Sequence, residues 1–183
     1  ILLAVSDEDA DALRELVPDV PVTVVSNVHP PEVEAADPAG RSGLVFVGYF
    51  GHAPNVDAMR DFCARTWPHV RRALPDATLT IVGGAPPPEI TALAGDGIEV
   101  TGWVPETAPY LDRARVSIAP LRFGAGVKGK IGEALSRGLP VVTTTIGAEG
   151  MGLRDGEHVL IADDPRAFAD AVVRLHRDDA LWL

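Results

Sequence analysis

The sequence of 183 residues is poor in cysteine and lysine and has no long apolar run. Its one cysteine, Cys63, excludes an internal disulfide and fits a reducing compartment. No stretch approaches the roughly 20 apolar residues that a membrane-spanning helix needs. We recognise no signal peptide and no initiator methionine at Ile1, and we expect a fragment of a longer, cytoplasmic protein. Peripheral contact with a membrane through the missing part is an alternative.

Basic residues and metal-ligand spacings are scarce as well. The net charge of −10 and the pI near 4.8 argue against nucleic acid as a partner, because affinity for its backbone depends on Lys and Arg. The five histidines show no paired ligand spacing, so we expect no metal site. The acidic run from Asp7 to Asp11 resembles a metal-binding DxD motif, but acidic residues in the first turn of a helix are the favoured interpretation. No cofactor is predicted.

The hydrophobic pattern predicts an α/β protein. A strand, a helix capped by Ser6 and a second strand are expected before Val25, followed by a linker rich in proline and acidic residues. From Leu44 onward strand and helix patterns alternate. The expected strands are 44–47, 78–82, 98–100, 116–119, 141–143 and 159–161, with helices at about 55–73, 86–93, 110–111, 127–137 and 165–177. This order predicts a Rossmann-like, doubly wound parallel sheet whose ligands gather where the strands end.

The stretch from Pro120 to Pro140, PLRFGAGVKGKIGEALSRGLP, is the strongest candidate for a binding site. Three glycines free the backbone ahead of an expected helix, and Lys128 and Lys130, the only lysines, lie where that helix begins. The exposed N–H groups and positive dipole end of a helix suit a phosphate or diphosphate. Glu133, one turn further, is placed to accept hydrogen bonds from sugar hydroxyls. Alternatively, these three charged side chains are an ordinary solvated face.

Two other loops follow expected strands. Gly48 and Gly51 precede the long helix, where a phosphate or a sugar would approach the backbone, and His52 is either an anion donor or a turn residue. Trp103 either stacks on a nucleobase or covers the core. The glycine spacing is not GxGxxG and no GK[ST] occurs, so a nicotinamide dinucleotide site is disfavoured and a P-loop is absent.

Several stretches together resemble one known family. They are FVGYFGHAPNVDAM, LTIVGG, VTGWVP, VSIAPLRFGAGVKGKIGEALSRGLPVVTT, GAEGM and DGEHVLIADDPRAFADAV. In this order they resemble the C-terminal, donor-binding domain of retaining glycosyltransferases of family 4, which have the two-domain GT-B fold. SNVHPP resembles the hinge between the domains. The resemblance implies that 1–42 are a remnant of the N-terminal acceptor domain with its linker, and that 43–183 bind a nucleotide sugar.

The resemblance also implies roles for single residues. Glu133 matches the glutamate that holds the donor ribose, whereas its usual partner, separated from it by seven intervening residues, is replaced by Ala125. Backbone N–H groups of the loop and one of the two lysines would then contact the donor. The implied catalytic residues are Lys128, Lys130 and Glu133, and the implied donor-binding residues are Gly48, Gly51, His52, Trp103, Val104, Gly124, Ala125, Gly126, Val127, Thr144 and Glu149.

The activity implied is retaining transfer of a sugar from a nucleotide-diphosphate sugar to a sugar, lipid-linked or small-molecule acceptor, without a metal. The fragment alone would be inactive, because the acceptor site would lie mainly on the missing N-terminal domain. A nucleotide-sugar epimerase of the same architecture and a noncatalytic nucleotide-binding module are the alternatives.

Overall fold

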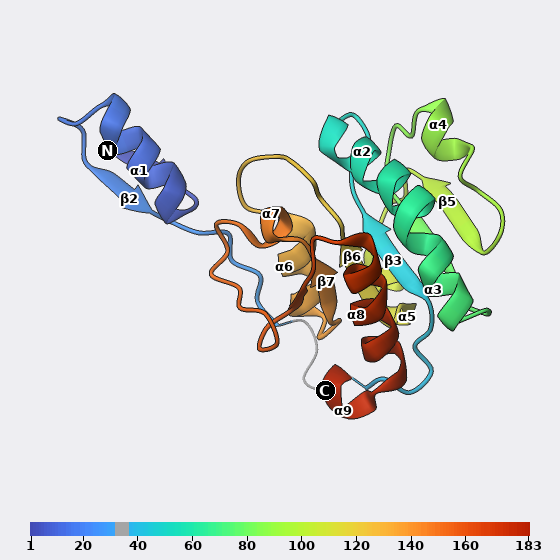
Figure 1. Cartoon of the computed structure of the whole chain (residues 1–183). Coiled ribbons are helices and arrows are strands. Elements are labelled where there is room, and N and C mark those ends of the chain that lie inside the picture. Colours follow the sequence, from blue (N-terminus) through green and yellow to red (C-terminus); the bar gives the residue numbers. More distant parts are fainter. Residues whose placement is uncertain (32–36) are drawn as a thin grey trace.

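The N-terminal part of the chain forms a small unit of its own. The computed structural model describes residues 1–31 and 37–183 (Figure 1). In it, β1 (Leu2–Ala4) and β2 (Val22–Val24) pair in parallel and flank α1 (Asp7–Leu16). Ser6 caps α1 by accepting a hydrogen bond from the N–H of Asp9, as predicted. Residues 32–36, in the expected linker, lie outside the described residues.

Among the described residues, six strands form a larger sheet in the order β5-β4-β3-β6-β7-β8, with every neighbouring pair parallel. The order runs outward from β3 through β4 and β5 on one side, and through β6, β7 and β8 on the other. This is the doubly wound Rossmann-like arrangement that the sequence predicted, and its switch point lies between β3 and β6. The strands are β3 (Leu44–Val47), β4 (Leu79–Val82), β5 (Ile98–Gly102), β6 (Val116–Ala119), β7 (Val141–Thr143) and β8 (Leu160–Ile161).

Helices cover both faces of this sheet (Figure 1). One core joins α2 (Ala53–Asp61), α3 (Trp67–Ala73), α4 (Pro88–Thr91) and α8 (Pro165–Arg177) to the sheet, and the other joins α5 (Ala108–Arg113) and α6 (Gly129–Ser136). Two short helices, α7 (Thr145–Ala148) and α9 (Asp179–Trp182), complete the described chain. No helix in the described residues is long and apolar enough to cross a membrane.

The two cores follow from alternation along the strands. In β3, Leu44 and Phe46 point to one core and Val45 to the other, and all three are at most 2% exposed. Burying a side chain such as Phe46 stabilises the fold by roughly 2 kcal/mol. This two-sided burial explains why the strands read as continuous apolar runs.

The structure corrects two boundaries. The helix expected over 55–73 is interrupted by a π-helical turn, η1 (Phe62–Thr66), in which the N–H of Trp67 donates to the carbonyl of Phe62. Pro68, in the first turn of α3, has no N–H to bond four residues back, so the helix cannot continue unbroken through this point. The helix expected from about Val127 begins at Gly129, because Lys128 takes a non-helical backbone conformation at the N-cap.

Candidate functional site

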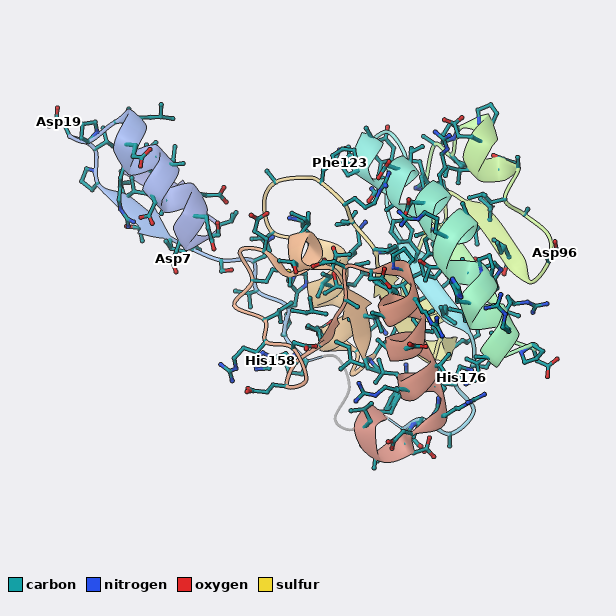
Figure 2. The ribbon with its side chains drawn as sticks, in the orientation of Figure 1. Asp7, Asp19, Asp96, Phe123, His158 and His176 are labelled. Atoms are coloured by element: carbon teal, nitrogen blue, oxygen red, sulfur yellow. The ribbon has the colours of Figure 1, made fainter. Side chains whose placement is uncertain are left out.

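A pocket of about 280 Å³ lies at the switch point of the sheet, where the loops after β3 and β6 meet. It is lined by His52, Pro54 and Asn55 from the first loop and α2, and by most of the segment 121–130. Phe123 lies on the second loop beside the start of α2 (Figure 2). Of the residues that the sequence predicted, His52, Gly124, Ala125, Val127, Lys128 and Lys130 come together here.

Glycines give the second loop its path. Gly124 and Gly126 have φ values of 124° and 76°, in the left-handed region that residues with a Cβ rarely adopt. Gly124 also packs against Pro54, since a Cβ on it would lie 3.3 Å from the proline ring. The loop then enters α6 at Gly129, so the N-terminus of this helix opens on the pocket. This arrangement presents backbone N–H groups and the positive end of a helix dipole to an anion.

Lys128 holds the loop to which it belongs. Its side chain is buried, and its Nζ donates to the carbonyls of Gly124 at 3.2 Å and Gly126 at 2.5 Å. The ammonium therefore satisfies two carbonyls of the loop and fixes the loop's curvature. The ammonium has three N–H donors, so at most one of them is left for a ligand while both bonds are kept.

The side chain of Lys130 has fewer hydrogen-bond acceptors around it than that of Lys128. Its Nζ donates to Oδ1 of Asn55 at 2.5 Å and lies 4.3 Å from the centre of the Phe46 ring. Burial, with a smaller contribution from the charge of Lys128, lowers the pKa of Lys130 to about 7. No acidic side chain is among the described residues that line the pocket. An anionic ligand would give Lys130 the negatively charged partner that these lining residues do not provide.

Asn55 and Arg122 were missed by the sequence reasoning. Asn55 is 7% exposed and contacts the site through its side-chain amide. Arg122 forms two hydrogen bonds to Asp57, at 2.8 and 2.6 Å, and an ion pair with Asp61 at 3.0 Å. Its guanidinium lowers the pKa of the Asp57 carboxyl and ties the loop to α2. No local signal could have found either contact, because the partners are 65 and 75 residues apart in the sequence.

Glu133 lies outside the pocket. It is half-buried on α6, and its Oε1 accepts a hydrogen bond from Oγ1 of Thr107, just before α5. Thr107 belongs to the loop after β5 that also carries Trp103 and Val104. Val104 packs against the core of α5 and α6. The pair of Glu133 and Thr107 therefore joins the helix of the pocket to the loop predicted to bind the nucleobase.

Trp103 is 76% exposed, which excludes the interpretation that it covers the core. It lies against the Gly84 backbone after β4, because a Cβ on Gly84 would be 3.5 Å from its Cδ1 and 3.8 Å from Cδ2 of Tyr49. Tyr49 is 57% exposed and makes an edge contact with the His52 ring, with 5.6 Å between the ring centres. Exposed aromatic faces therefore flank Gly84 at the ends of β3, β4 and β5.

Of the four remaining predicted residues, three have structural contacts and Glu149 is exposed. A Cβ on Gly48 would lie 3.0 Å from the Asn55 amide, and one on Gly51 would lie 2.3 Å from the Tyr49 ring, so both glycines allow close packing. Thr144 is buried, donates to the carbonyl of Leu121 at 2.5 Å and caps α7. Glu149 is exposed at the end of α7. None of these four lines the pocket.

No cluster of three or more His, Cys, Asp or Glu side chains among residues 1–31 and 37–183 could hold a metal ion. The chemistry that the described site offers is electrostatic. It consists of loop amides, a helix N-terminus and a buried lysine, all of which stabilise negative charge at a fixed position.

Comparison with known proteins gives a consistent result. The family model described as Glycosyl transferases group 1 matches residues 41–178. An uncharacterised 44.6 kDa protein of the cps region of Klebsiella pneumoniae is 29% identical over 144 residues, 74% of this chain and 37% of that protein. A phosphatidyl-myo-inositol mannosyltransferase of Mycobacterium leprae is 35% identical over 121 residues, 62% and 32% of the two chains. The chain thus spans about a third of the length of these curated relatives.

Solved structures share the fold. The crystal structure of a mutant of TarM from S. aureus, in complex with fondaparinux, alpha-GlcNAc-glycerol and UDP, superposes with a TM-score of 0.76. The match covers 98% of this chain and 37% of TarM at 15% identity. At this identity the likeness concerns the fold alone.

Proposed function

The chain belongs to the glycosyl transferases group 1 family, and from this premise we propose that the intact protein transfers a sugar from a nucleotide-diphosphate sugar to an acceptor, with retention. The relative from Mycobacterium leprae is a mannosyltransferase, and the TarM structure contains UDP, which supports a donor of this class. The observation that carries the proposal is the pocket at the switch point, where Lys130, the loop amides and the α6 N-terminus converge.

The chemistry follows from the charge that develops at the leaving group. When the bond between sugar and diphosphate breaks, negative charge grows on the diphosphate oxygens. Lys130 and the N-terminus of α6 are held in place before the reaction, so they stabilise this charge without reorganising. Lys128 contributes mainly by fixing the loop through the carbonyls of Gly124 and Gly126. A metal ion is not required for this step.

The rest of the donor has a place on the same edge of the sheet. The exposed faces of Tyr49 and Trp103 offer a stacking surface for a nucleobase. Glu133, hydrogen-bonded to Thr107 on the loop of Trp103, is then positioned to accept hydrogen bonds from the ribose. The backbone around Thr144 to Glu149 would approach the sugar or the diphosphate.

We also propose that residues 43–183 are the donor domain and that 1–42 belong to an acceptor domain and its linker. In support, β1 and β2 form a separate two-stranded sheet, and Leu3 and Val25 in and beside it are 65% and 53% exposed. Such apolar residues are expected to pack against further structure. The acceptor would bind mainly there, and the fragment alone would not catalyse transfer.

Calorimetric titration of the intact protein with UDP, GDP and ADP tests the proposal. One nucleotide should bind, and the double variant Lys128→Ala/Lys130→Ala should lower both its affinity and the kcat for transfer by at least about tenfold, since each charge-assisted hydrogen bond is worth roughly 1.5–3 kcal/mol. Arg166→Ala, which removes an exposed cation on α8, is the control. Absence of binding by all three nucleotides, or unchanged kinetics in the double variant, would reject the assignment. Conversion of the donor without an acceptor would indicate an epimerase.

A further inference from the structure

Asn55 has one polar neighbour on each side of its amide. Its Nδ2 donates to the carbonyl of Tyr49 at 2.7 Å, and its Oδ1 accepts from Nζ of Lys130 at 2.5 Å. The Tyr49 carbonyl can only accept and the ammonium can only donate, so a single orientation of the amide satisfies both. The backbone of the β3 loop therefore determines that an oxygen faces Lys130.

The packing around Asn55 leaves its side chain little freedom. The residue is 7% exposed in the first turn of α2, and a Cβ on Gly48 would lie 3.0 Å from both Cγ and Nδ2 of Asn55. Close approach of the Gly48 backbone thus clamps the amide. Since Lys130 has a long flexible side chain, a rigid acceptor at its end reduces the rotamer entropy that ligand binding would cost.

The partner of Lys130 is also neutral. The groups of the pocket that carry or can carry charge are Lys128 on the approach to α6 and His52 ahead of α2, and both are potential cations. Glu133, on the same helix as Lys130, is hydrogen-bonded to Thr107. On β3 the contact is the uncharged ring of Phe46. A carboxylate at position 55 would neutralise Lys130 and compete with an anion, whereas an amide holds it without doing so.

We propose that Asn55 is a positioning residue for the donor, holding Lys130 at the pocket without a counter-charge so that the incoming diphosphate supplies the charge and a proton binds with it. This inference rests on the proposed function and adds to it a role for Asn55 and the uptake of one proton when the diphosphate binds. The pKa of Lys130, lowered to about 7 by burial and by Lys128, means that at pH 8 this side chain is mostly neutral in the free protein. A bound diphosphate raises that pKa again, and the lysine takes up a proton.

Titration calorimetry with UDP at pH 8, in two buffers of different ionisation enthalpy, measures this proton. If GDP or ADP binds the intact protein more tightly, it replaces UDP. The wild type should take up nearly one proton per nucleotide, and Lys130→Gln should take up none. Asn55→Ala should bind about tenfold more weakly but keep the uptake, because Lys130 loses its support and stays without a counter-charge.

Asn55→Asp distinguishes positioning from simple packing. The new carboxylate would keep Lys130 charged in the free protein, so both the proton uptake and most of the affinity should be lost. Ala64→Asp adds the same charge at an exposed position of η1, which lines a different pocket, and should behave as the wild type. If circular dichroism shows that Asn55→Asp does not fold, the affinity and proton uptake of Asn55→Ala, compared with those of Lys130→Gln, test the positioning role.

The outcomes separate the two proposals. If none of the three nucleotides binds the wild type, the proposed function fails and this inference fails with it. If a nucleotide binds without proton uptake, or if Asn55→Ala binds it as tightly as the wild type does, this inference fails while the donor site stands.

Discussion

Lys128 and Lys130 are separated by one glycine, but they end in different surroundings. The Lys128 side chain turns back onto two carbonyls of its own loop, and the Lys130 side chain crosses to α2 and the Phe46 ring. The charge of Lys128 is compensated by two carbonyl dipoles, whereas Lys130 contacts one amide oxygen and the face of the Phe46 ring. In the proposed transfer the electrostatic role therefore falls to Lys130, and the shaping of the loop mainly to Lys128.

A pH-dependent stability follows for Lys130. Its folded pKa of about 7 lies below the ordinary value of 10.5, so between these pH values the unfolded chain binds more protons than the folded one. The free energy of unfolding attributable to Lys130 should therefore rise between pH 7 and about 10.5, by at most about 1.4 kcal/mol per pH unit, and be flat below pH 7. Urea unfolding of the wild type and Lys130→Gln over this range measures the difference.

The matched control is Arg166→Gln, an exposed cation on α8, whose unfolding free energy should follow that of the wild type at every pH. A difference between wild type and Lys130→Gln that stays constant from pH 7 to about 10 would show that Lys130 remains charged in the folded protein.

At this scale the sequence predicted the charged groups better than their partners. The glycines and lysines of 124–130 were recognisable because a short stretch contains both the flexible backbone and the cations. Asn55 could not be recognised, since an Asn near the start of a helix usually has only a local role. Its contact with Lys130 spans 75 residues and exists only after β3 and β6 pair.

Among the elements, β3 and β4 are neighbouring strands, and the residues that follow them, Gly48 and Gly83, are in close backbone contact beside the site. A Cβ on Gly83, where φ is 154°, would lie 1.7 Å from the carbonyl oxygen of Gly48. Gly83→Ala should therefore force the two backbones apart and lower the free energy of unfolding by roughly 3 kcal/mol. Because Gly48 packs on Asn55, nucleotide affinity should fall as well. Chemical denaturation and calorimetry measure both.

Gly95→Ala provides the comparison for Gly83→Ala. Gly95 also has a positive φ, 120°, but a Cβ there would have nothing within 4 Å, so only backbone strain of about 1 kcal/mol is expected. Equal losses in the two variants would mean that strain, not the contact between strands, makes Gly83 necessary.

The strand and helix order was predictable because each long element carries its own apolar period. The range 165–177 matched α8, and the six strands were all recognised. The π-helical turn before Pro68 and the short helix α7 were not. The hydrogen bond from Thr144 to Leu121 and those between Thr145 and Asp163 hold α7, and they depend on tertiary structure that a local pattern does not contain.

For the whole molecule, the segment after β2 contacts the helix that begins at the pocket (Figure 1). The His29 ring lies against Gly132 of α6, where a Cβ would be 2.3 Å from its Cδ2. The neighbouring unit approaches the loop after α7 too, since a Cβ on Gly150 would lie 3.4 Å from Cβ of Ser6. The proposed linker between the acceptor and donor domains therefore contacts α6 directly.

Gly132→Ala should displace the His29 ring without disturbing the six-stranded sheet, because the conflict is with one side chain. We expect the His29 Cε1–H resonance, assigned by its loss in His29→Gln, to shift in Gly132→Ala, with a smaller loss of stability than in Gly83→Ala. Gly129→Ala, where an added Cβ meets nothing within 4 Å, should leave that resonance unchanged. If Gly132→Ala leaves it unchanged as well, the linker does not rest on α6 in solution. If Gly132→Ala both displaces His29 and changes the nucleotide affinity, the linker and the proposed donor pocket are coupled through α6.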